Sequence, residues 1–325
     1  MRFFILCSRL LVLAVAAQAQ NPLAPRGFKF VGRKKGVAGG CDAEDVAVIL
    51  KELETAEKAA EFAAQHLTEY PYFWAFQAPD HPFFQGKDFE RAARDLYARM
   101  AQVADGFHTE KRFRIECRSD LCLMSGDDTI AATQESMVRM VLPPQLWLKR
   151  PDDPVMAFCG PFFKPSTWLS TLSVESTEKR LQQFRKVLHD NPDAEDLDTK
   201  DTILNMRSVG NTRSQIILHE LAHTAYVSKP IMEILKPNAM TESITLDHAY
   251  EANSCFWTAQ GVFDRKTRKV PDPLAGAKLA AENAESWGLV AMGIYMSSQL
   301  QIQQIPIPGV PNYAWAHTDK VKKPI

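Results

Sequence analysis

Two histidines separated by three residues, His219 and His223, enclose Glu220 in the segment His-Glu-Leu-Ala-His. In an α-helix, positions i and i+4 lie on one face, so both imidazoles can reach one metal ion, at about 2.0–2.1 Å for zinc. Glu220 falls beside them, where a general base for a water molecule on the metal would sit. The neighbouring residues are apolar, and Asn211 or Thr212 can cap the start of the segment. The sequence therefore predicts a core helix that carries a metal site.

The motif is specific enough to outweigh the alternative of two unconnected histidines on a helix. With eight histidines in 325 residues, it would arise by chance in about one such sequence in a hundred. A catalytic zinc site needs three protein ligands and one open position. Two downstream residues compete for the third place. Glu242 follows His223 after 18 residues, a spacing that resembles the gluzincin peptidases, and Asp247 lies a little further on.

Asp247 and Tyr250 lie in the segment Thr-Leu-Asp-His-Ala-Tyr, where we expect a helix from Asp247 to Gln260. Residues at positions i and i+3 share a helix face. Such a helix would place the carboxylate of Asp247 on the metal and the phenol of Tyr250 over a substrate carbonyl.

Here the chain resembles the aspzincins, the family of deuterolysin and peptidyl-Lys metallopeptidases. In that family the motif His-Glu-x-x-His is followed by Gly-Thr-x-Asp-x-x-Tyr-Gly. Thr245, Asp247 and Tyr250 match this second motif, whereas Ile244 and Glu251 replace its two glycines. Because glycine permits close backbone approach and unusual dihedral angles, the replacements predict a reshaped cleft.

The resemblance covers most of residues 41–300, with an apparent insertion near 165–205. It implies a zincin-like metallopeptidase fold and one zinc ion held by His219, His223 and Asp247. It also implies that Glu220 is the general base and that Tyr250 assists at the transition state. The resemblance further implies that the substrates are proteins or peptides. The other matching features are Cys41 before the first long helix, Cys117 and Cys122 near paired short strands, Cys159 at the start of Cys-Gly-Pro-Phe-Phe, and Asn283–Trp287, which is similar to the family's Asn-Ala-Asp-Ser-Tyr.

The N-terminus is typical of a secretory signal peptide. Arg2 precedes an apolar run that ends in Ala17-Gln18-Ala19, so we expect a signal at 1–19 and a secreted, extracellular protein. Residues 20–40 are rich in Pro, Gly and basic residues. They are expected to form a flexible leader, which is either a short pro-segment cut at Arg33–Lys35 or a solvated tail. Residues 41–325 would form the metallopeptidase domain.

Removal of the signal leaves five cysteines, an odd number. Spacing alone does not determine their pairing. The family resemblance implies disulfides between Cys41 and Cys117 and between Cys122 and Cys159. Cys255 would then be free, and we expect it to be buried and inert rather than nucleophilic.

The fold class expected from periodicity is α+β, predominantly helical, with a small β-sheet and the His-Glu-x-x-His helix beside a cleft. Expected helices span Asp42–Tyr70, Asp88–Asp105, Glu175–Leu188, Thr212–Val227, Asp247–Gln260 and Leu274–Gln301, and expected strands span Phe113–Cys117, Leu121–Met124 and Val155–Cys159.

The overall charge gives no reason to expect nucleic acid or an anionic membrane as a partner. The formal net charge is −1 and the pI is about 6.7, so function must come from a local site. We expect a monomer that acts on peptides. An alternative from another class is a secreted non-catalytic binding protein or effector with a structural zinc. Such a site would have four protein ligands and no open position.

Overall fold

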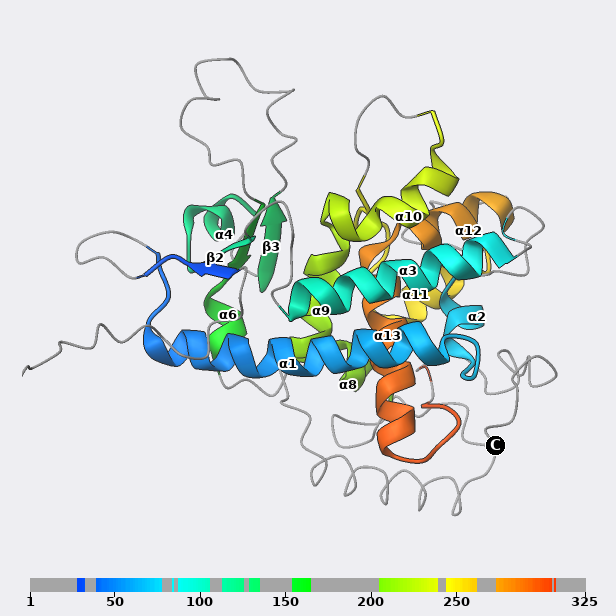
Figure 1. The fold of residues 1–325 in the computed structure, drawn as a ribbon, viewed down its shortest axis with the longest axis horizontal. Coiled ribbons are helices and arrows are strands. Elements are labelled where there is room, and N and C mark those ends of the chain that lie inside the picture. Colours follow the sequence, from blue (N-terminus) through cyan, green and yellow to red (C-terminus); the bar gives the residue numbers. More distant parts are fainter. Residues whose placement is uncertain are drawn as a thin grey trace, which may run out of the picture.

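The 24-residue helix α1 (Ala43–His66) passes beneath both the sheet and much of the helical part in the computed structural model (Figure 1). Its start is closed by a capping box, because the Asp42 side chain accepts a hydrogen bond from the Asp45 amide and Asp45 returns one to Asp42. Ile49, Leu53 and Ala56 belong to its buried stripe. The structure describes residues 28–32, 39–77, 84, 87–105, 113–125, 129–134, 154–164, 205–238, 244–261, 273–305 and 307.

Most of the described residues are helical, and a single sheet accompanies them, which confirms the predicted α+β class. The sheet, with α4 and α6, lies near the start of α1, and most of the other helices gather towards its end (Figure 1). The remaining helices are α2 (Tyr72–Gln77), α3 (Lys87–Ala104), α4 (Asp120–Ser125), α6 (Gly160–Phe163), α8 (Met206–Gly210), α9 (Arg213–Ala222), α10 (Ala225–Leu235), α11 (Ala252–Ala259), α12 (Pro273–Glu282) and α13 (Ala284–Gln299).

Helix α13 crosses the centre of the core and contacts both α1 and α9. Trp287 on α13 is fully buried, and its indole nitrogen donates a hydrogen bond to the carbonyl of Ala281 at 2.9 Å. Tyr97 on α3 packs edge-on against Trp287 and donates to its carbonyl at 3.0 Å. Both buried aromatic side chains thus have partners for their polar atoms, as buried Tyr and Trp require.

The sheet has the strand order β1-β2-β4-β3, formed by β1 (Phe28–Phe30), β2 (Phe113–Cys117), β3 (Ala131–Gln134) and β4 (Val155–Phe158). β1 and β4 pair parallel to β2, and β3 pairs antiparallel to β4. The alternation predicted for 113–117 is confirmed, since every second residue of β2 is buried. β3 was not predicted, and it forms the end of the sheet nearest to α9.

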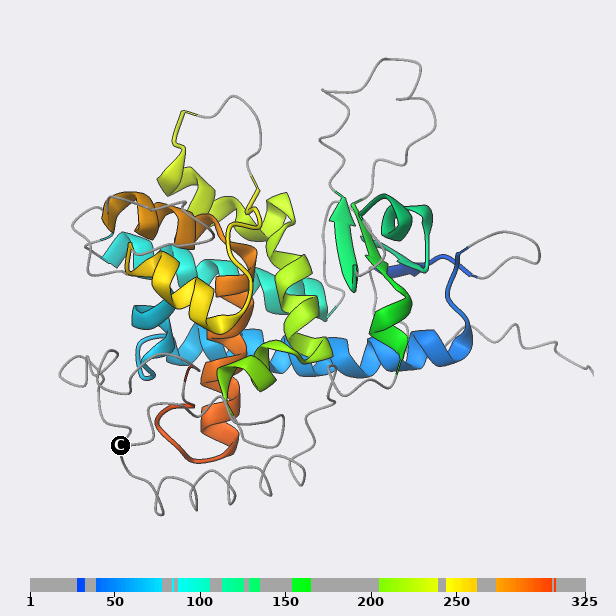
Figure 2. The same cartoon turned by 180° about the vertical axis from the view of Figure 1, so that it is seen from behind.

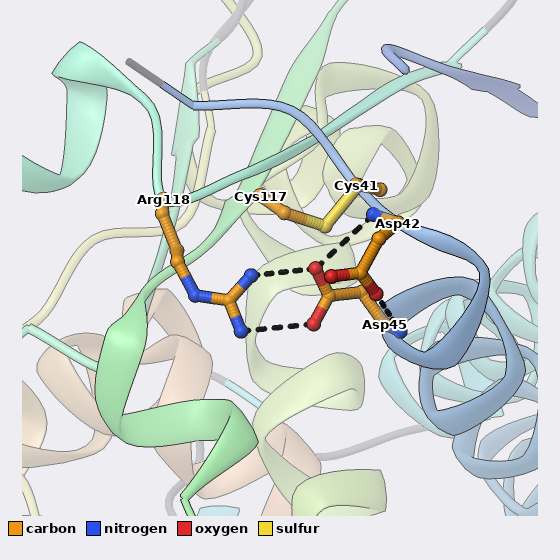
Figure 3. Close-up of a disulfide and its surroundings, with 5 residues drawn as sticks. All are labelled: Cys41, Asp42, Asp45, Cys117 and Arg118. Carbon is orange, nitrogen blue, oxygen red and sulfur yellow. Dashed lines mark hydrogen bonds and ion pairs between the residues drawn. A yellow bond between two sulfur atoms is a disulfide. The ribbon is translucent and has the colours of Figure 1, made fainter. Parts of the chain in front are cut away.

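A compact cluster ties the sheet to the start of α1 (Figure 3). Cys41 and Cys117 form a disulfide, and the Arg118 guanidinium pairs with both oxygens of Asp45 at 2.5 and 2.9 Å. Arg118 also lies over the ring of Phe163 at 4.3 Å. A bidentate pair of this kind fixes orientation as well as position. The second expected disulfide, between Cys122 and Cys159, is present too, and Cys255 is free and buried.

Several element predictions were wrong in detail. Residues 121–124 were expected to be a strand but belong to helix α4, where the Cys122 amide donates to the carbonyl of Ser119 and Cys122 forms its disulfide with Cys159. The helix expected over 212–227 is divided at His223 and Thr224, which lie between the end of α9 at Ala222 and the start of α10 at Ala225. The helix expected over 274–301 is divided at Asn283.

The leader expected over 20–40 is not wholly irregular, since residues 28–30 form strand β1 and pair in register with Phe113–Ile115. Phe28 and Phe30 pack against the core, which gives this short strand a reason to form. The predicted signal peptide, the basic triplet 33–35 and the helix expected over 175–188 lie outside the described residues. So does the insertion near 165–205, except for Asn205. None of the described helices is both long enough and apolar enough to cross a membrane.

Candidate metal centre

Helix α9 presents the two predicted histidines and forms for local reasons. The Thr212 side chain caps its start by accepting a hydrogen bond from the Gln215 amide. Ile217, Leu218 and Leu221 are fully buried and fix its rotation in the core. The last regular residue is Ala222, so that His223 forms the C-terminal cap.

Three potential ligand atoms meet at the end of this helix. Nε2 of His219 and Nε2 of His223 lie 3.1 Å apart, and each lies 3.2 Å from Oδ1 of Asp247. Around a tetrahedral zinc ion with ligands at about 2.0–2.1 Å, neighbouring ligand atoms lie about 3.3 Å apart. The triangle therefore fits such an ion without rearrangement. These residues form the one group of at least three potential ligands found among the described residues.

The His219 ring is oriented by a carboxylate on α13. Nδ1 of His219 lies 2.9 Å from Oε2 of Glu285, which also accepts a hydrogen bond from Nε2 of Gln215 at 2.9 Å. All three side chains are buried. The close approach of the helices depends on Gly288, because a Cβ there would lie 2.9 Å from Nε2 of Gln215 and 3.4 Å from the His219 amide nitrogen.

The His223 ring is oriented by a backbone carbonyl. Nδ1 of His223 lies 2.9 Å from the carbonyl oxygen of Thr245, and the Thr245 hydroxyl donates to the carbonyl of Ala222 at 2.8 Å. Thr245 therefore both caps the end of α9 and holds the ring. This explains physically why threonine suits the position two residues before Asp247.

With both Nδ1 atoms donating to oxygen, both Nε2 atoms turn their lone pairs towards Asp247. Three acceptor atoms within 3.2 Å of one another repel unless a cation lies among them. A proton can supply this positive charge in place of a metal ion. Burial works against both charged groups, yet hydrogen bonds to Asp247 and Glu285 raise the pKa of His219, and hydrogen bonds from His219 and His223 hold the pKa of Asp247 well below its usual range.

Asp247 and Tyr250 do not lie on a helix, contrary to the prediction for 247–260. Helix α11 begins only at Ala252. The reason is that the backbone at Leu246 pairs with the junction of α12 and α13 instead of forming helical hydrogen bonds. In Figure 2 the yellow segment that holds Asp247 runs beside α9 and α13. The structure thus brings Asp247 to the histidines from a loop.

Glu220 is buried beside the triangle, and its Oε2 has no hydrogen-bond partner among the described residues. Burial raises the pKa of this carboxyl, while the neighbouring histidines oppose the shift. A desolvated carboxylate with a free oxygen and a raised pKa has the properties of a general base.

Tyr250 lies at the rim of the site, with 42% of its surface exposed. Its ring stacks on that of His219, with centroids 6.0 Å apart. Burial of the hydroxyl and then the charge of Asp247 raise the pKa of Tyr250, so the phenol keeps its proton at neutral pH. The protonated phenol can donate a hydrogen bond, and in this structure its hydroxyl interacts with the carboxylate of Asp247.

The centre opens into a cleft of about 890 Å³. One wall is formed by residues 129–133 at the edge strand β3, and the opposite wall by residues 244–247 and 250–252. Helix α9 lies at its base, with Glu220 and both histidines among the lining residues. The arrangement leaves the metal side of the triangle accessible to a ligand.

Comparison with family models, curated proteins and solved structures found no match.

Sequence reasoning missed two supporting residues, Glu285 and Asn283. The signal was present in the segment Asn283–Trp287, whose likeness to the aspzincins was noted without a role for either side chain. Glu242, the rival third ligand, lies outside the described residues.

One of the two replaced glycines has a direct structural consequence. Glu251 has φ 64° and ψ 149°, a region that is essentially restricted to glycine. This replacement therefore places a side chain where the backbone favours glycine.

Proposed function

We propose that this protein is a secreted zinc-dependent endopeptidase of the aspzincin type. The observation that carries the proposal is the convergence of His219, His223 and Asp247, with ligand atoms 3.1–3.2 Å apart, next to the buried carboxylate of Glu220. The cleft in front of these residues supports turnover rather than a purely structural role.

The donor set favours zinc. Two imidazole nitrogens and one carboxylate oxygen are ligands that zinc accepts, and three protein ligands with an open position are typical of catalytic sites. A structural site would use a fourth protein group, and the described residues supply three. Glu285 and the Thr245 carbonyl hold the rings in the tautomer that a metal requires.

When bound, zinc supplies Lewis acidity, which polarises a carbonyl and lowers the pKa of a water molecule to about 7. Glu220 takes the proton of the attacking water, because its carboxylate is buried beside the ligand triangle and burial raises its pKa. It later passes this proton to the leaving amine. Tyr250 donates its hydroxyl proton in a hydrogen bond to the substrate carbonyl oxygen as negative charge develops there.

A peptide substrate is supported by the position of β3. Among the described residues β3 pairs with β4 alone and so forms an edge of the sheet, and residues 129–133 line the cleft. An extended peptide can hydrogen-bond to such an edge through its backbone, independently of its side chains. This backbone mode fits protein and peptide substrates of varied sequence.

Secretion is supported by the signal-like N-terminus and by the two disulfides, which form and persist in oxidising compartments. The environment expected for the enzyme is therefore extracellular.

The test is cleavage of a mixed peptide library by wild-type protein, with and without a zinc chelator, repeated with Glu220→Gln. We expect cleavage that the chelator abolishes and that zinc restores, and a Glu220→Gln variant at least about 10³-fold slower. Glu233→Gln, at an exposed position of α10, is the matched control. A wild-type protein that binds zinc but cleaves no peptide would overturn the proposed activity in favour of a non-catalytic role.

A further inference from the structure

Asn283 interrupts the helical segment between α12 and α13, and this residue is completely buried. Its Oδ1 accepts hydrogen bonds from the backbone amides of His248 and Ala249, at 2.9 and 3.1 Å. Its Nδ2 donates to the carbonyl of Ala249 at 3.1 Å and to the Ser286 hydroxyl at 2.9 Å. One side chain thus makes three hydrogen bonds to the backbone of the loop that holds Asp247.

The backbone on either side of Asn283 adds two more contacts to the same loop. The Leu246 amide donates to the carbonyl of Glu282 at 2.7 Å, and the Ala284 amide donates to the carbonyl of Leu246 at 3.0 Å. Asp247 is therefore fastened on both sides, at Leu246 by the backbone and at His248 and Ala249 by the Asn283 amide.

The Asn283 side chain does not cap the helix that follows it. Asparagine is favoured at the position before a helix because its side-chain oxygen can accept from an amide of the first turn. At the start of α13 the Asn283 side chain makes no such cap. Its oxygen faces the loop instead, so helix capping does not explain the residue.

We propose that Asn283 is a positioning residue that sets the carboxylate of Asp247 at the metal site. The inference rests on the proposed zinc site. Ligands must be held within about 0.5 Å of their working geometry, and the loop from Leu246 to Glu251 forms no helix or named strand. Asparagine is the suitable residue, because it offers an acceptor for two amides and donors for a carbonyl on the same short side chain. Aspartate keeps the acceptors but lacks the donors.

The first test is metal binding by chelator-treated protein, using Zn²⁺ in a competition titration and Co²⁺ absorption as a report on coordination geometry. Asn283→Asp and Asn283→Ala are compared with Asn253→Asp, a position where the side-chain oxygen accepts a hydrogen bond from the neighbouring Ser254 amide. We expect about a 10–100-fold loss of zinc affinity and an altered cobalt spectrum in the Asn283 variants alone. Unchanged affinity in Asn283→Asp would overturn the proposal.

A double-mutant cycle separates positioning from a general structural effect. In an Asp247→Ala background the loop no longer carries a ligand. Asn283→Asp should then change the weak zinc affinity left by the two histidines by less than about 2-fold. An equal loss in both backgrounds would show that Asn283 acts on the whole site rather than through Asp247, and would overturn the proposal.

Amide hydrogen exchange on zinc-free wild-type protein tests the clamp without any variant. The amides of His248 and Ala249 should be protected before metal is added. Their free exchange would contradict the proposal even if the variants do not fold. A wild-type protein that binds no zinc yet protects these amides would instead refute the proposed zinc site and leave the clamp intact.

Discussion

Nδ1 of His219 lies 2.9 Å from Oε2 of Glu285, across the contact between α9 and α13. The carboxylate fixes the ring so that Nε2 faces Asp247, and it balances positive charge at the centre. Glu285 also binds Gln215, one turn before His219 on α9. The long C-terminal helix is therefore part of the metal centre and does more than cover it.

Glu285→Ala should lower zinc affinity by about 10–100-fold, because the His219 ring loses the acceptor that orients it. Glu285→Gln keeps an oxygen but carries no charge, so its zinc affinity should lie between those of Glu285→Ala and wild type. Zinc competition titration measures both, with Glu233→Gln as the exposed control. Equal affinities for all four proteins would show that the contact has no influence on the metal.

Tyr250→Phe should reduce kcat by about 10²-fold and leave KM nearly unchanged. The lost hydroxyl would act on charge that develops in the transition state, and loss of one such donor costs about 10²–10³ in kcat. Steady-state kinetics on a peptide identified from the library provides the measurement. A variant with a raised KM and an unchanged kcat would assign Tyr250 to substrate binding instead.

Glu220→Gln should change the pH dependence of stability in the zinc-free protein. Burial raises the pKa of Glu220 in the folded state above its unfolded value, which is about 4.3. The folded state then binds this proton more tightly, so the carboxyl weakens folding progressively as pH rises above the unfolded pKa. Glutamine does not ionise and avoids this cost.

Thermal melting of the two zinc-free proteins between pH 4 and pH 7 tests this prediction. The melting temperatures should be similar near pH 4, and the advantage of Glu220→Gln should grow towards neutral pH. An advantage that is constant across the range, or one that shrinks with rising pH, would contradict the assigned burial.

Glu251→Gly should stabilise the protein by about 1 kcal/mol. Glu251 has φ 64° and ψ 149°, a conformation in which a side chain costs about 1–3 kcal/mol. The greater conformational freedom of glycine in the unfolded chain offsets part of this gain. Glu251→Ala is the matched control, since it removes the carboxylate but keeps the strained Cβ. Denaturant unfolding should separate the two variants. If alanine stabilises as much as glycine, the carboxylate rather than the backbone is unfavourable.

The helices with a clear apolar stripe were predictable from sequence. α1 and α3 agree with the predicted ranges to within a few residues, and Asp42, the first residue of the predicted range, caps α1. Their periodicity arises from burial along one continuous face, which a sequence displays directly. The strand at 113–117 was predictable for the same reason, because its inward residues alternate.

The interrupted segments were not predictable, because their breaks depend on tertiary contacts. Apolar periodicity continues through Asn283, but the helix is interrupted there because Leu246 forms backbone hydrogen bonds with Glu282 and Ala284. The same contact keeps Asp247 and Tyr250 out of α11. Both residues were chosen by motif and both line the cleft, although the helix assumed for them was wrong.

The contact between His219 and Glu285 could not be predicted from the sequence, because it too depends on tertiary packing. The residues are 66 positions apart, and only the close crossing of α9 and α13 at Gly288 brings them together. A glycine in a helix interior is a weak signal by itself.

In the proposed site His219, His223 and Asp247 hold one zinc ion. The most direct measurement is the zinc content per chain of wild-type protein, Asp247→Ala and Glu242→Ala after equilibration with zinc and exhaustive dialysis. We predict one zinc per chain in wild type and in Glu242→Ala, and loss of the metal in Asp247→Ala. A wild-type protein without zinc, or a site lost in Glu242→Ala and kept in Asp247→Ala, would contradict the account.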